Sequence, residues 1–540
     1  MPANTLYFGD NLAILREHFP AESVDLVYLD PPFNSDRNYN FIYRDLAGEG
    51  DTAQLEAFSD TWTMEGAAAE FAEVTGSSYP EGELLDALHR MLGDAPLVAY
   101  LSVMALRLRE LHRVLKPTGS LYLHCDDAAS HYLKLVLDAI FGPENYGNEI
   151  IWKRTSGHAD AARYGRVHDT LLYYTAGPTA TMNAVFQPYD DAYVEQYYRY
   201  RDPDGRRFMS GDASAAGLTG GGYTYAWKGV TRLWRYPLET MQRLDAEGRL
   251  YYTRNGIARV KRYLDEMPGM PAQDLWYDIE ALRSWHAERL GYPTQKPLAL
   301  LERIISASSN PGDLVLDPFC GCGTAVVAAQ SLGRHWAGID ITSLSVTLMR
   351  QRLADAFPEA YPTPGDVPVV GLPRDLAGAQ LMAAEDPYDF QFWALTLIGA
   401  SPPGGTKKRG ADRGIDGEII WHDGENQRCR AIVSVKGTSS ATVTQLRELV
   451  GAVEAHKAQA GVFLTLAPPT GPMRTLAAQS GEYHLAGTDA RYPRIQVLSI
   501  EQLLAGARVD LPRIRRLDPT ARAQPAGKPD DGQQSLGLED

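Results

Sequence analysis

The chain has 540 residues, of which 44% are apolar and 22% charged, and its formal net charge is −16. This length predicts two to four domains, and the composition is typical of a globular protein rather than a fibrous or disordered one. No apolar run reaches the roughly 18 residues of a membrane span, and residues 1–20 lack the layout of a signal peptide. Four cysteines in so long a chain exclude a disulfide scaffold and favour a reducing cytoplasm.

The first part of the chain alternates short apolar runs with segments of helical spacing. The expected strands cover residues 6–8, 24–29 and 120–124, and the expected helices cover 11–18, 97–115 and 129–140. Residues 45–95 are acidic and poorly patterned, which predicts an insertion or a flexible cover. The alternation of strands and helices predicts a doubly wound, Rossmann-like α/β sheet.

The middle of the chain, residues 178–290, lacks this alternation, and Thr219–Gly222 indicates a flexible loop. Residues 151–300 hold 20 Lys and Arg against 17 Asp and Glu, interleaved with many aromatic residues, although the whole chain is acidic. Such a mixture suits contact with phosphates and bases. The same composition also fits an ordinary tyrosine-rich fold with solvated charges.

The alternation returns after residue 290, with helices expected at 298–308 and 325–332 and strands at 314–316 and 336–339. A proline-containing linker is expected at 357–385. A second, smaller α/β block follows at 386–512, and residues 513–540 form a polar tail of disordered composition.

The strand expected at 24–29 ends in Asp30-Pro31-Pro32-Phe33. Ligands of open α/β sheets bind beyond the carboxyl ends of the strands. The lone pair of an exocyclic base nitrogen is conjugated with its ring, so two acceptors aimed at its hydrogens would make the nitrogen more nucleophilic. The Asp30 carboxylate and the Pro31 carbonyl are candidates for these acceptors, the two prolines stiffen the turn, and Phe33 can stack on an extruded base. A rigid turn with a capping aspartate remains the alternative.

A second motif, Asp317-Pro318-Phe319-Cys320-Gly321-Cys322-Gly323-Thr324, lies between a strand and a helix, and Asp340 ends the next strand. Glycines there let a ligand approach the backbone, and an acid at the next strand end can hold two ribose hydroxyls. The loop lacks the residue order of a phosphate-binding loop, so a nucleoside without phosphates, such as S-adenosylmethionine, is expected. No His/Cys cluster accompanies the two cysteines, which argues against a metal.

The order of these motifs resembles the β-class DNA amino-methyltransferases: Asp-Pro-Pro-Phe first, a long variable middle, then Thr294-Gln295-Lys296-Pro297 and Asp-Pro-Phe-x-Gly-x-Gly-Thr. The resemblance covers roughly residues 5–355. It implies a catalytic half at 1–177, target recognition at 178–290 and a cofactor half at 291–356. The segment Arg166–Asp169 resembles a strand entry before the recognition region, and no chemistry is assigned to it.

The resemblance also implies roles for single residues. The catalytic residues would be Asp30, Pro31, Pro32 and Phe33. Asp10, after Gly9, would reach the cofactor adenine, and Thr294, Lys296 and Pro297 would close over its methionine end. The cofactor residues are completed by Asp317, Phe319, Gly321, Gly323, Thr324 and Asp340.

Absence of a Pro-Cys pair argues against covalent C5 methylation of cytosine, so direct transfer to an amino nitrogen is expected. The leading aspartate of the tetrapeptide favours adenine N6, with cytosine N4 as the alternative. The expected partner is double-stranded DNA, in a restriction-modification or phage-defence system, and no membrane. A homodimer and separate restriction or defence subunits are open alternatives.

The block at 386–512 resembles the Mrr-like branch of the PD-(D/E)XK nucleases. Asp416 and Lys436 match the family's pattern of an acid followed by acid-x-Lys, and Ser434 departs from it, because an acid or amide is expected there. Glu454 is a candidate substitute. The pattern implies Mg²⁺ at Asp416, and a decayed, DNA-binding domain is the alternative to active cleavage.

Overall fold

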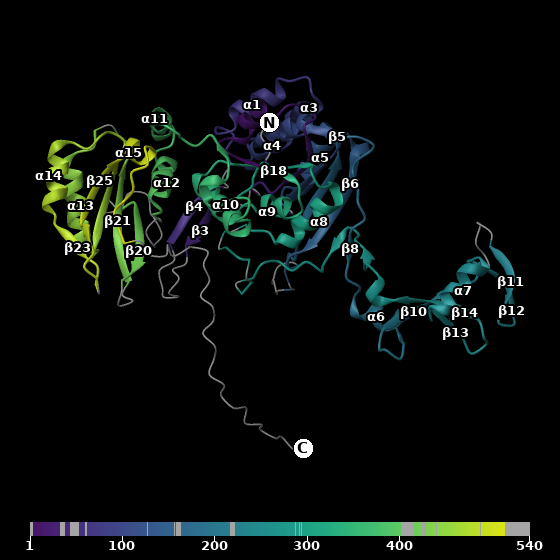
Figure 1. Cartoon of the computed structure of the whole chain (residues 1–540). Coiled ribbons are helices and arrows are strands. Elements are labelled where there is room, and N and C mark those ends of the chain that lie inside the picture. Colours follow the sequence, from purple (N-terminus) through teal and green to yellow (C-terminus); the bar gives the residue numbers. More distant parts are fainter. Residues whose placement is uncertain are drawn as a thin grey trace, which may run out of the picture. The chain divides into compact units, whose positions relative to one another are not determined.

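The computed structural model describes most of the chain. The described residues are 4–32, 38–43, 53–59, 62–126, 128–155, 157, 164–215, 222–283, 285–286, 288–290, 292, 294–400, 415–423, 428–438, 440–486 and 488–512. The chain forms two compact units, one comprising Met1–Met182 with Ile279–Asp540 and the other Asn183–Asp278 (Figure 1). Among the described residues, no helix is both long enough and apolar enough to cross a membrane.

A mixed sheet forms the centre of the first unit and runs in the order β6-β7-β5-β2-β17-β18-β1-β19. The strands are β1 (Thr5–Phe8), β2 (Val24–Leu29), β5 (Leu115–Cys125), β6 (Tyr146–Lys153), β7 (His168–Thr175), β17 (Leu314–Asp317), β18 (His335–Asp340) and β19 (Val369–Val370). All neighbours from β5 to β19 pair in parallel, whereas β7 is antiparallel to both β5 and β6. The predicted doubly wound α/β fold is confirmed.

The pairing of β2 with β17 decides where the two sequence motifs lie. Val315 pairs with Leu26 and Leu316 with Val27. Because the two strands are parallel, their carboxyl ends share one edge of the sheet, which brings the turn after β2 next to the loop after β17. The two strands are neighbours in the sheet although they are far apart in the chain, and ligands of open α/β sheets bind beyond the carboxyl ends of the strands.

Helices cover the sheet where their apolar faces meet its buried strands. One core joins β2 and β5 to α1 (Asn11–His18), α4 (Pro96–Val114) and α5 (Ser130–Phe141) through residues such as Leu15, Leu108 and Leu133. Three further helices follow the motifs of the cofactor half: α8 (Leu298–Ser308), α9 (Thr324–Ser331) and α10 (Ser343–Ala356). The elements predicted from periodicity in both halves are confirmed, with ends that differ by a few residues.

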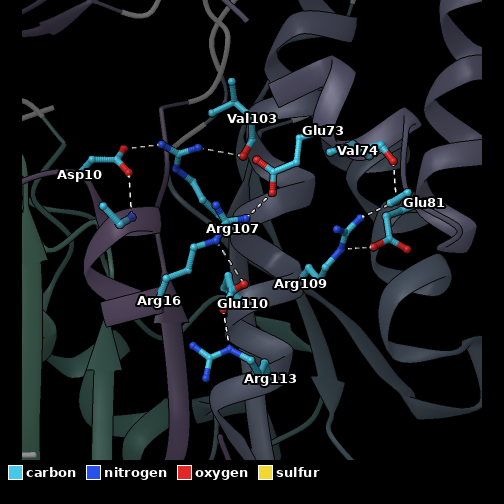
Figure 2. Close-up of polar contacts among 12 residues, drawn as sticks. Asp10, Arg16, Glu73, Val74, Glu81, Val103, Arg107, Arg109, Glu110 and Arg113 are labelled. Atoms are coloured by element: carbon cyan, nitrogen blue, oxygen red, sulfur yellow. Dashed lines mark hydrogen bonds and ion pairs between the residues drawn. The ribbon is translucent and has the colours of Figure 1, made fainter. Parts of the chain in front are cut away.

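The expectation of a flexible cover is wrong for much of residues 45–95. β3 (Asn38–Tyr43) pairs with β4 (Ala53–Ser59), and α2 (Ala68–Thr75) and α3 (Pro80–Leu92) are helices. Leu85 and Leu88 are buried in the core of the first unit. Glu81, only 2% exposed, accepts a hydrogen bond from Arg109 at 2.6 Å (Figure 2). The acidic composition concealed these helices because part of the charge is paired inside the fold.

The region expected as a linker is packed against its neighbours. β19 adds to the sheet beside β1, a 3₁₀ turn forms at Pro364–Asp366, and α11 (Leu376–Glu385) buries Ala379 and Met382. The prolines between 362 and 373 mark only the irregular part of this connection.

The C-terminal block is a second, smaller α/β domain, shown in green and yellow in Figure 1. Its sheet has the order β20-β21-β22-β25. The elements are α12 (Pro387–Ile398), β20 (Gly417–His422), β21 (Arg428–Lys436), α13 (Val443–Ala455), β22 (Ala460–Thr465), α14 (Gly471–Gln479), β23 (Glu482–His484), β24 (Arg491–Pro493), β25 (Ile495–Ser499) and α15 (Ile500–Leu504). The expected tail at 513–540 lies outside the described residues.

The unit Asn183–Asp278 has its own sheet, in the order β13-β14-β10-β9, and its own core around Trp234 and Met241. Its elements are β8 (Phe186–Gln187), α6 (Asp191–Tyr197), β9 (Tyr200–Arg201), β10 (Arg207–Asp212), β11 (Tyr223–Trp227), β12 (Val230–Trp234), α7 (Leu238–Ala246), β13 (Leu250–Tyr252), β14 (Ala258–Tyr263), a 3₁₀ turn (Leu264–Glu266), β15 (Met270–Pro271) and β16 (Leu275–Trp276). The loop expected at Thr219–Gly222 lies outside the described residues except for Gly222.

Candidate active site

A cavity of about 450 Å³ lies at the shared edge of β2 and β17. This volume is in the usual range for small-molecule sites. Of the residues predicted for catalysis and cofactor binding, it is lined by Asp10, Asp30, Pro31, Pro32, Thr294, Lys296, Asp317, Phe319, Gly321, Thr324 and Asp340. Gly323 and Pro297 are the N-cap residues of α9 and α8 and are not among the lining residues, and Phe33 lies outside the described residues.

Asp30 is the residue with the most unusual environment in the cavity. Its Oδ2 forms an ion pair with the Lys296 ammonium, and both side chains are nearly buried. Its Oδ1 is shielded from water and has no hydrogen-bond partner among the described residues. Leaving a buried acceptor unpaired costs roughly 1–3 kcal/mol. Lys296 therefore fixes one oxygen of the carboxylate, while the other can accept a donor from a ligand.

The loop after β17 uses backbone conformations that favour glycine. Gly321 and Gly323 have φ values of +48° and +76°. A Cβ on Gly321 would lie 3.0 Å from the ring of Tyr292, and one on Gly323 would lie 2.6 Å from Met349. The Asp317 carboxylate accepts a hydrogen bond from the Phe319 amide at 3.1 Å, and burial raises its pKa well above the usual range.

Asp340 joins this loop to the end of β18. Its Oδ2 accepts a hydrogen bond from the Gly321 amide at 2.8 Å, and its Oδ1 accepts from the Thr342 amide and hydroxyl, each at 2.9 Å. Burial raises the pKa of this carboxyl, and the hydrogen bonds oppose that rise. The acid expected to hold ribose hydroxyls thus lines the cavity and also holds the cofactor loop in place.

Asp10 belongs to the polar network of Figure 2. Its Oδ1 caps α1 by accepting from the Ala13 amide at 3.1 Å, and its Oδ2 pairs with Arg107 at 2.6 Å. Arg107 also donates to Asn11, whose side chain donates to the Pro318 carbonyl at 2.9 Å. Asp10 lines the cavity, and its two oxygens join α1 to α4, while Asn11 connects the same network to the Pro318 carbonyl of the cofactor loop.

Three groups at this site were missed from the sequence. Arg107 carried no signal beyond its place in a helix. His124 is fully buried beside the site: its Nδ1 lies 3.2 Å from the Tyr28 hydroxyl and its Nε2 lies 3.1 Å from the Asp169 carboxylate. Burial and the nearby charge of Lys296 lower the pKa of His124. His124 could have been found as a polar residue at the end of an apolar strand. Asp169 could have been found as the last residue of the segment Arg166–Asp169.

The third missed group comes from the C-terminal block. Asp386, the N-cap of α12, and Asp389, in its first turn, line the cavity. Asp389 Oδ1 accepts hydrogen bonds from the Ser343 amide at 3.1 Å and hydroxyl at 2.8 Å, at the start of α10. Burial raises the pKa of Asp389 to about 6. Sequence spacing gave no signal here, because this helix follows the methyltransferase motifs in the chain.

The nuclease-like residues meet at one end of the second sheet. Asp416 Oδ1 accepts from the Gln391 amide at 3.0 Å, and its Oδ2 accepts from the Val435 amide at 2.7 Å and the Ser434 hydroxyl at 3.2 Å. Lys436 Nζ lies 3.8 Å from Oδ2. Glu454 is exposed on α13. Within the described part of the chain, no group of three or more His, Cys, Asp or Glu side chains could hold a metal.

A doubly wound sheet with an Asp-Pro-Pro turn beside a nucleoside-sized, glycine-lined cavity defines a methyltransferase acting on amino groups of nucleic-acid bases. The chain belongs to the DNA methylase family of N6 and N4 amino-methyltransferases, whose family model matches residues 24–350. Residues 383–490 match the family described as restriction endonuclease, so an endonuclease-like domain follows the methylase. The resemblances drawn from the motifs of both blocks are confirmed.

Curated relatives agree with this assignment. The type II methyltransferase M.EcaI of Enterobacter cloacae is 27% identical over 362 residues, which cover 66% of this chain and 70% of the relative. The DNA adenine methyltransferase YhdJ of Escherichia coli is 26% identical over 352 residues, covering 65% and 83%. The StyLTI Mod subunit of a Salmonella typhimurium type III restriction-modification enzyme is 28% identical over 354 residues, covering 62% and 51%.

Among solved structures, the PvuII cytosine-N4-specific DNA methyltransferase matches with a TM-score of 0.32 and 14% identity, covering 68% of this chain and 94% of that one. The complex of M1.HpyAVI with S-adenosylmethionine matches with a TM-score of 0.30 and 16% identity, covering 65% and 98%.

Proposed function

We propose that this chain methylates adenine N6 in double-stranded DNA, with S-adenosylmethionine as the methyl donor. The observation that carries the proposal is the Asp30 carboxylate, which has one oxygen paired with Lys296 and the other buried without a partner, inside the cavity of the cofactor loop. The cavity fits a nucleoside cofactor, because glycines permit close backbone approach and Asp340 offers a ribose acceptor.

The cofactor would supply an electrophilic methyl group on a sulfonium, and its nucleoside would lie against Gly321 and Asp340. Thr294 and Lys296 would close the cavity around its methionine end. The Lys296 ammonium fixes the position of the Asp30 carboxylate by pairing with its Oδ2. These groups are fixed before a base arrives, which is the general source of electrostatic and proximity catalysis.

The base would meet Asp30 after leaving the helix. Asp30 Oδ1 accepts one hydrogen of the amino group, and the Pro31 carbonyl is the candidate acceptor for the second. Both bonds draw the nitrogen toward a tetrahedral shape and direct its lone pair at the methyl group. With the cofactor bound, the nitrogen would take the methyl group from its sulfonium, and the Asp30 carboxylate would accept the proton that the nitrogen then releases.

The choice of adenine over cytosine N4 rests on Asp30 as the first residue of the tetrapeptide and on similarity to an adenine-specific relative. Similarity to a type III Mod subunit supports a place in a restriction-modification system with separate subunits. Sequencing that reads modified bases in DNA from cells expressing the protein would report the base and the site. Methylation at cytosine N4 alone would overturn the adenine assignment.

Incubation of the protein with labelled cofactor and duplex DNA tests the reaction itself. We expect label on DNA with the natural chain and none with Asp30→Ala, while cofactor binding by calorimetry persists in the variant. Absence of label with the natural chain on DNA of many sequences would refute the proposal.

For the second domain we propose DNA binding without cleavage. The Asp416 carboxylate is engaged by donors of the chain, and a hydroxyl at Ser434 replaces an acid, so the residues present do not fit Mg²⁺. We expect unmethylated DNA to remain intact with Mg²⁺ present. Mg²⁺-dependent cutting that is lost in Lys436→Ala would instead establish the alternative, a bifunctional methyltransferase and endonuclease.

A further inference from the structure

The register of the sheet in the unit Asn183–Asp278 places three arginines on one face. Arg201 of β9 lies opposite Arg207 of β10, and Arg262 of β14 lies opposite Met209 of β10. Directly opposite residues share a face, and so do residues two apart on one strand. Arg201, Arg207 and Arg262 therefore occupy the same face of three neighbouring strands.

Further contacts fix the position of these side chains. A Cβ on Gly211, the next residue of this face along β10, would lie 3.1 Å from Arg262 Nε, so the arginine extends across the glycine. Arg201 and Arg262 are exposed. The far end of the same face, at Leu250 and Ala258, is buried in the core with Trp234. One end of this sheet face is therefore covered by the apolar core, and the three arginines lie at its other end.

None of these three arginines forms an ion pair in the described part of this unit. Arg201 donates at 3.3 Å to the Gly205 carbonyl, and Arg207 Nε is buried without a hydrogen-bond partner. Burying a guanidinium N–H unpaired is costly unless a ligand pairs it. Three unneutralised cations on one face form a strong local positive potential despite the acidic chain.

Most cations on the opposite face are neutralised within the protein; the exception is Arg259, which is half-buried and donates to the Ser210 carbonyl at 3.1 Å. Lys261 pairs with Asp202 at 2.7 Å. Arg206, after β9, pairs with Asp265 at 2.9 Å and with Glu266 at 2.8 Å, and its guanidinium lies 3.9 Å from the ring centre of Tyr263. Arg249 pairs with Glu266 as well. The two faces therefore differ in available charge, although both are rich in basic residues.

We propose that the face of Arg201, Arg207 and Arg262 binds the phosphate backbone of duplex DNA, and that the opposite face does not. The proposal rests on the proposed function, because it takes DNA as the substrate. Three neighbouring strands span about 10 Å, so the arginines can contact more than one phosphate of the duplex. The planar guanidinium donates two parallel hydrogen bonds to a phosphate, which suits arginine for this contact.

Phosphate contacts position the duplex and carry no sequence information. The arginine face would therefore hold the DNA without choosing the site. Each arginine that neutralises a phosphate releases counterions from the DNA. Each such contact should therefore make the slope of log K against log salt concentration steeper by about 0.9.

The test measures DNA binding by fluorescence anisotropy over a series of salt concentrations, using the full chain with bound cofactor. Arg201→Gln, Arg207→Gln and Arg262→Gln are compared with Arg206→Gln and Arg249→Gln, which remove equal charge from the opposite face. We expect each of the first three to weaken binding roughly three- to tenfold at 0.1 M salt and to lower the salt slope by about 0.9. The loss should be the same for methylatable and unrelated duplexes, and the controls should change little.

The melting temperature and the cofactor affinity of each variant show whether it folds, and Arg207→Lys keeps the charge if Arg207→Gln does not fold. A variant that carries all three glutamine substitutions should show the largest loss. If its salt slope is unchanged while the natural chain methylates DNA, the inference about the arginine face fails and the proposed function stands. Loss of binding only to methylatable DNA would also overturn it, because it would indicate base contacts. If the natural chain neither binds nor methylates DNA, the proposed function itself fails.

Discussion

Asp30 and Asp416 are both acids at the edge of a sheet, next to a lysine, and the structure treats them differently. Asp30 has one oxygen paired with Lys296 and the other buried beside a cavity without a partner. Asp416 has each oxygen occupied by a donor of the chain. A motif therefore indicates a reactive carboxylate only when the fold leaves an acceptor for the ligand. By this criterion one oxygen of Asp30 is left for a ligand, whereas both oxygens of Asp416 already accept hydrogen bonds from the chain.

The largest expected effect tests the Asp30 side of this comparison. Asp30→Asn keeps the shape but removes the charge, so we expect methyl transfer to fall by about a thousandfold, the upper range for one preorganised group. Cofactor affinity should change less than threefold. Single-turnover transfer and calorimetry measure the two quantities. A variant with transfer near the natural rate would show that the unpaired oxygen has no catalytic role.

The next effect concerns the cofactor loop. Gly323 has a φ of +76°, and a Cβ there would meet Met349, whereas Gly333 has a φ of +69° with nothing within 4 Å of an added Cβ. We expect both Gly323→Ala and Gly333→Ala to lose about 1–2 kcal/mol of stability from backbone strain. Only Gly323→Ala should weaken cofactor binding, by about tenfold. Equal cofactor affinities in the two variants would contradict the place given to this loop.

Asp416→Asn tests the other side of the comparison. The amide cannot accept all the bonds that Asp416 accepts from Gln391, Ser434 and Val435, so we expect a loss of about 1–3 kcal/mol in the unfolding free energy of the C-terminal domain. Methyl transfer should stay within about twofold of the natural chain. Chemical denaturation and the transfer assay measure both. A stable variant with altered DNA cleavage would mean that Asp416 is catalytic after all.

The smallest effect is a pH dependence at Asp389, whose pKa is raised to about 6 by burial. In the unfolded chain this carboxyl has an ordinary pKa near 3.9. Its ionisation therefore costs more in the folded state, and its contribution to stability falls as pH rises from about 4 to 6. The unfolding free energy of Asp389→Asn, measured by denaturant unfolding, should rise by about 1–2 kcal/mol relative to that of the natural chain as the pH is raised from 4.5 to 7. A constant difference across this range would show that Asp389 is not buried as described.

Residues close together in the sequence determined much of this protein. The apolar run 24–29, the turn Asp30–Pro32 and the glycines 321 and 323 are local features, because strand burial, proline rigidity and positive φ are properties of a few consecutive residues. They were sufficient to predict the Rossmann-like fold, the methylase family and most of the cavity. The acidic stretch 45–95 was misread because the pairing of Glu81 with Arg109 is not a local property.

Only the tertiary structure decided which groups meet. Pairing of β2 with β17 joins Asp30 to a loop almost three hundred residues away, Arg107 and His124 enter from other elements, and α12 brings Asp389 from the second domain. The structure alone also decided which acceptors are occupied. Lys296 pairs with one oxygen of Asp30, and amide groups of the chain donate to both oxygens of Asp416. The physical reason is that burial, ion pairing and an unsatisfied acceptor arise from neighbours in space, whereas spacing in a sequence reports only neighbours along the chain.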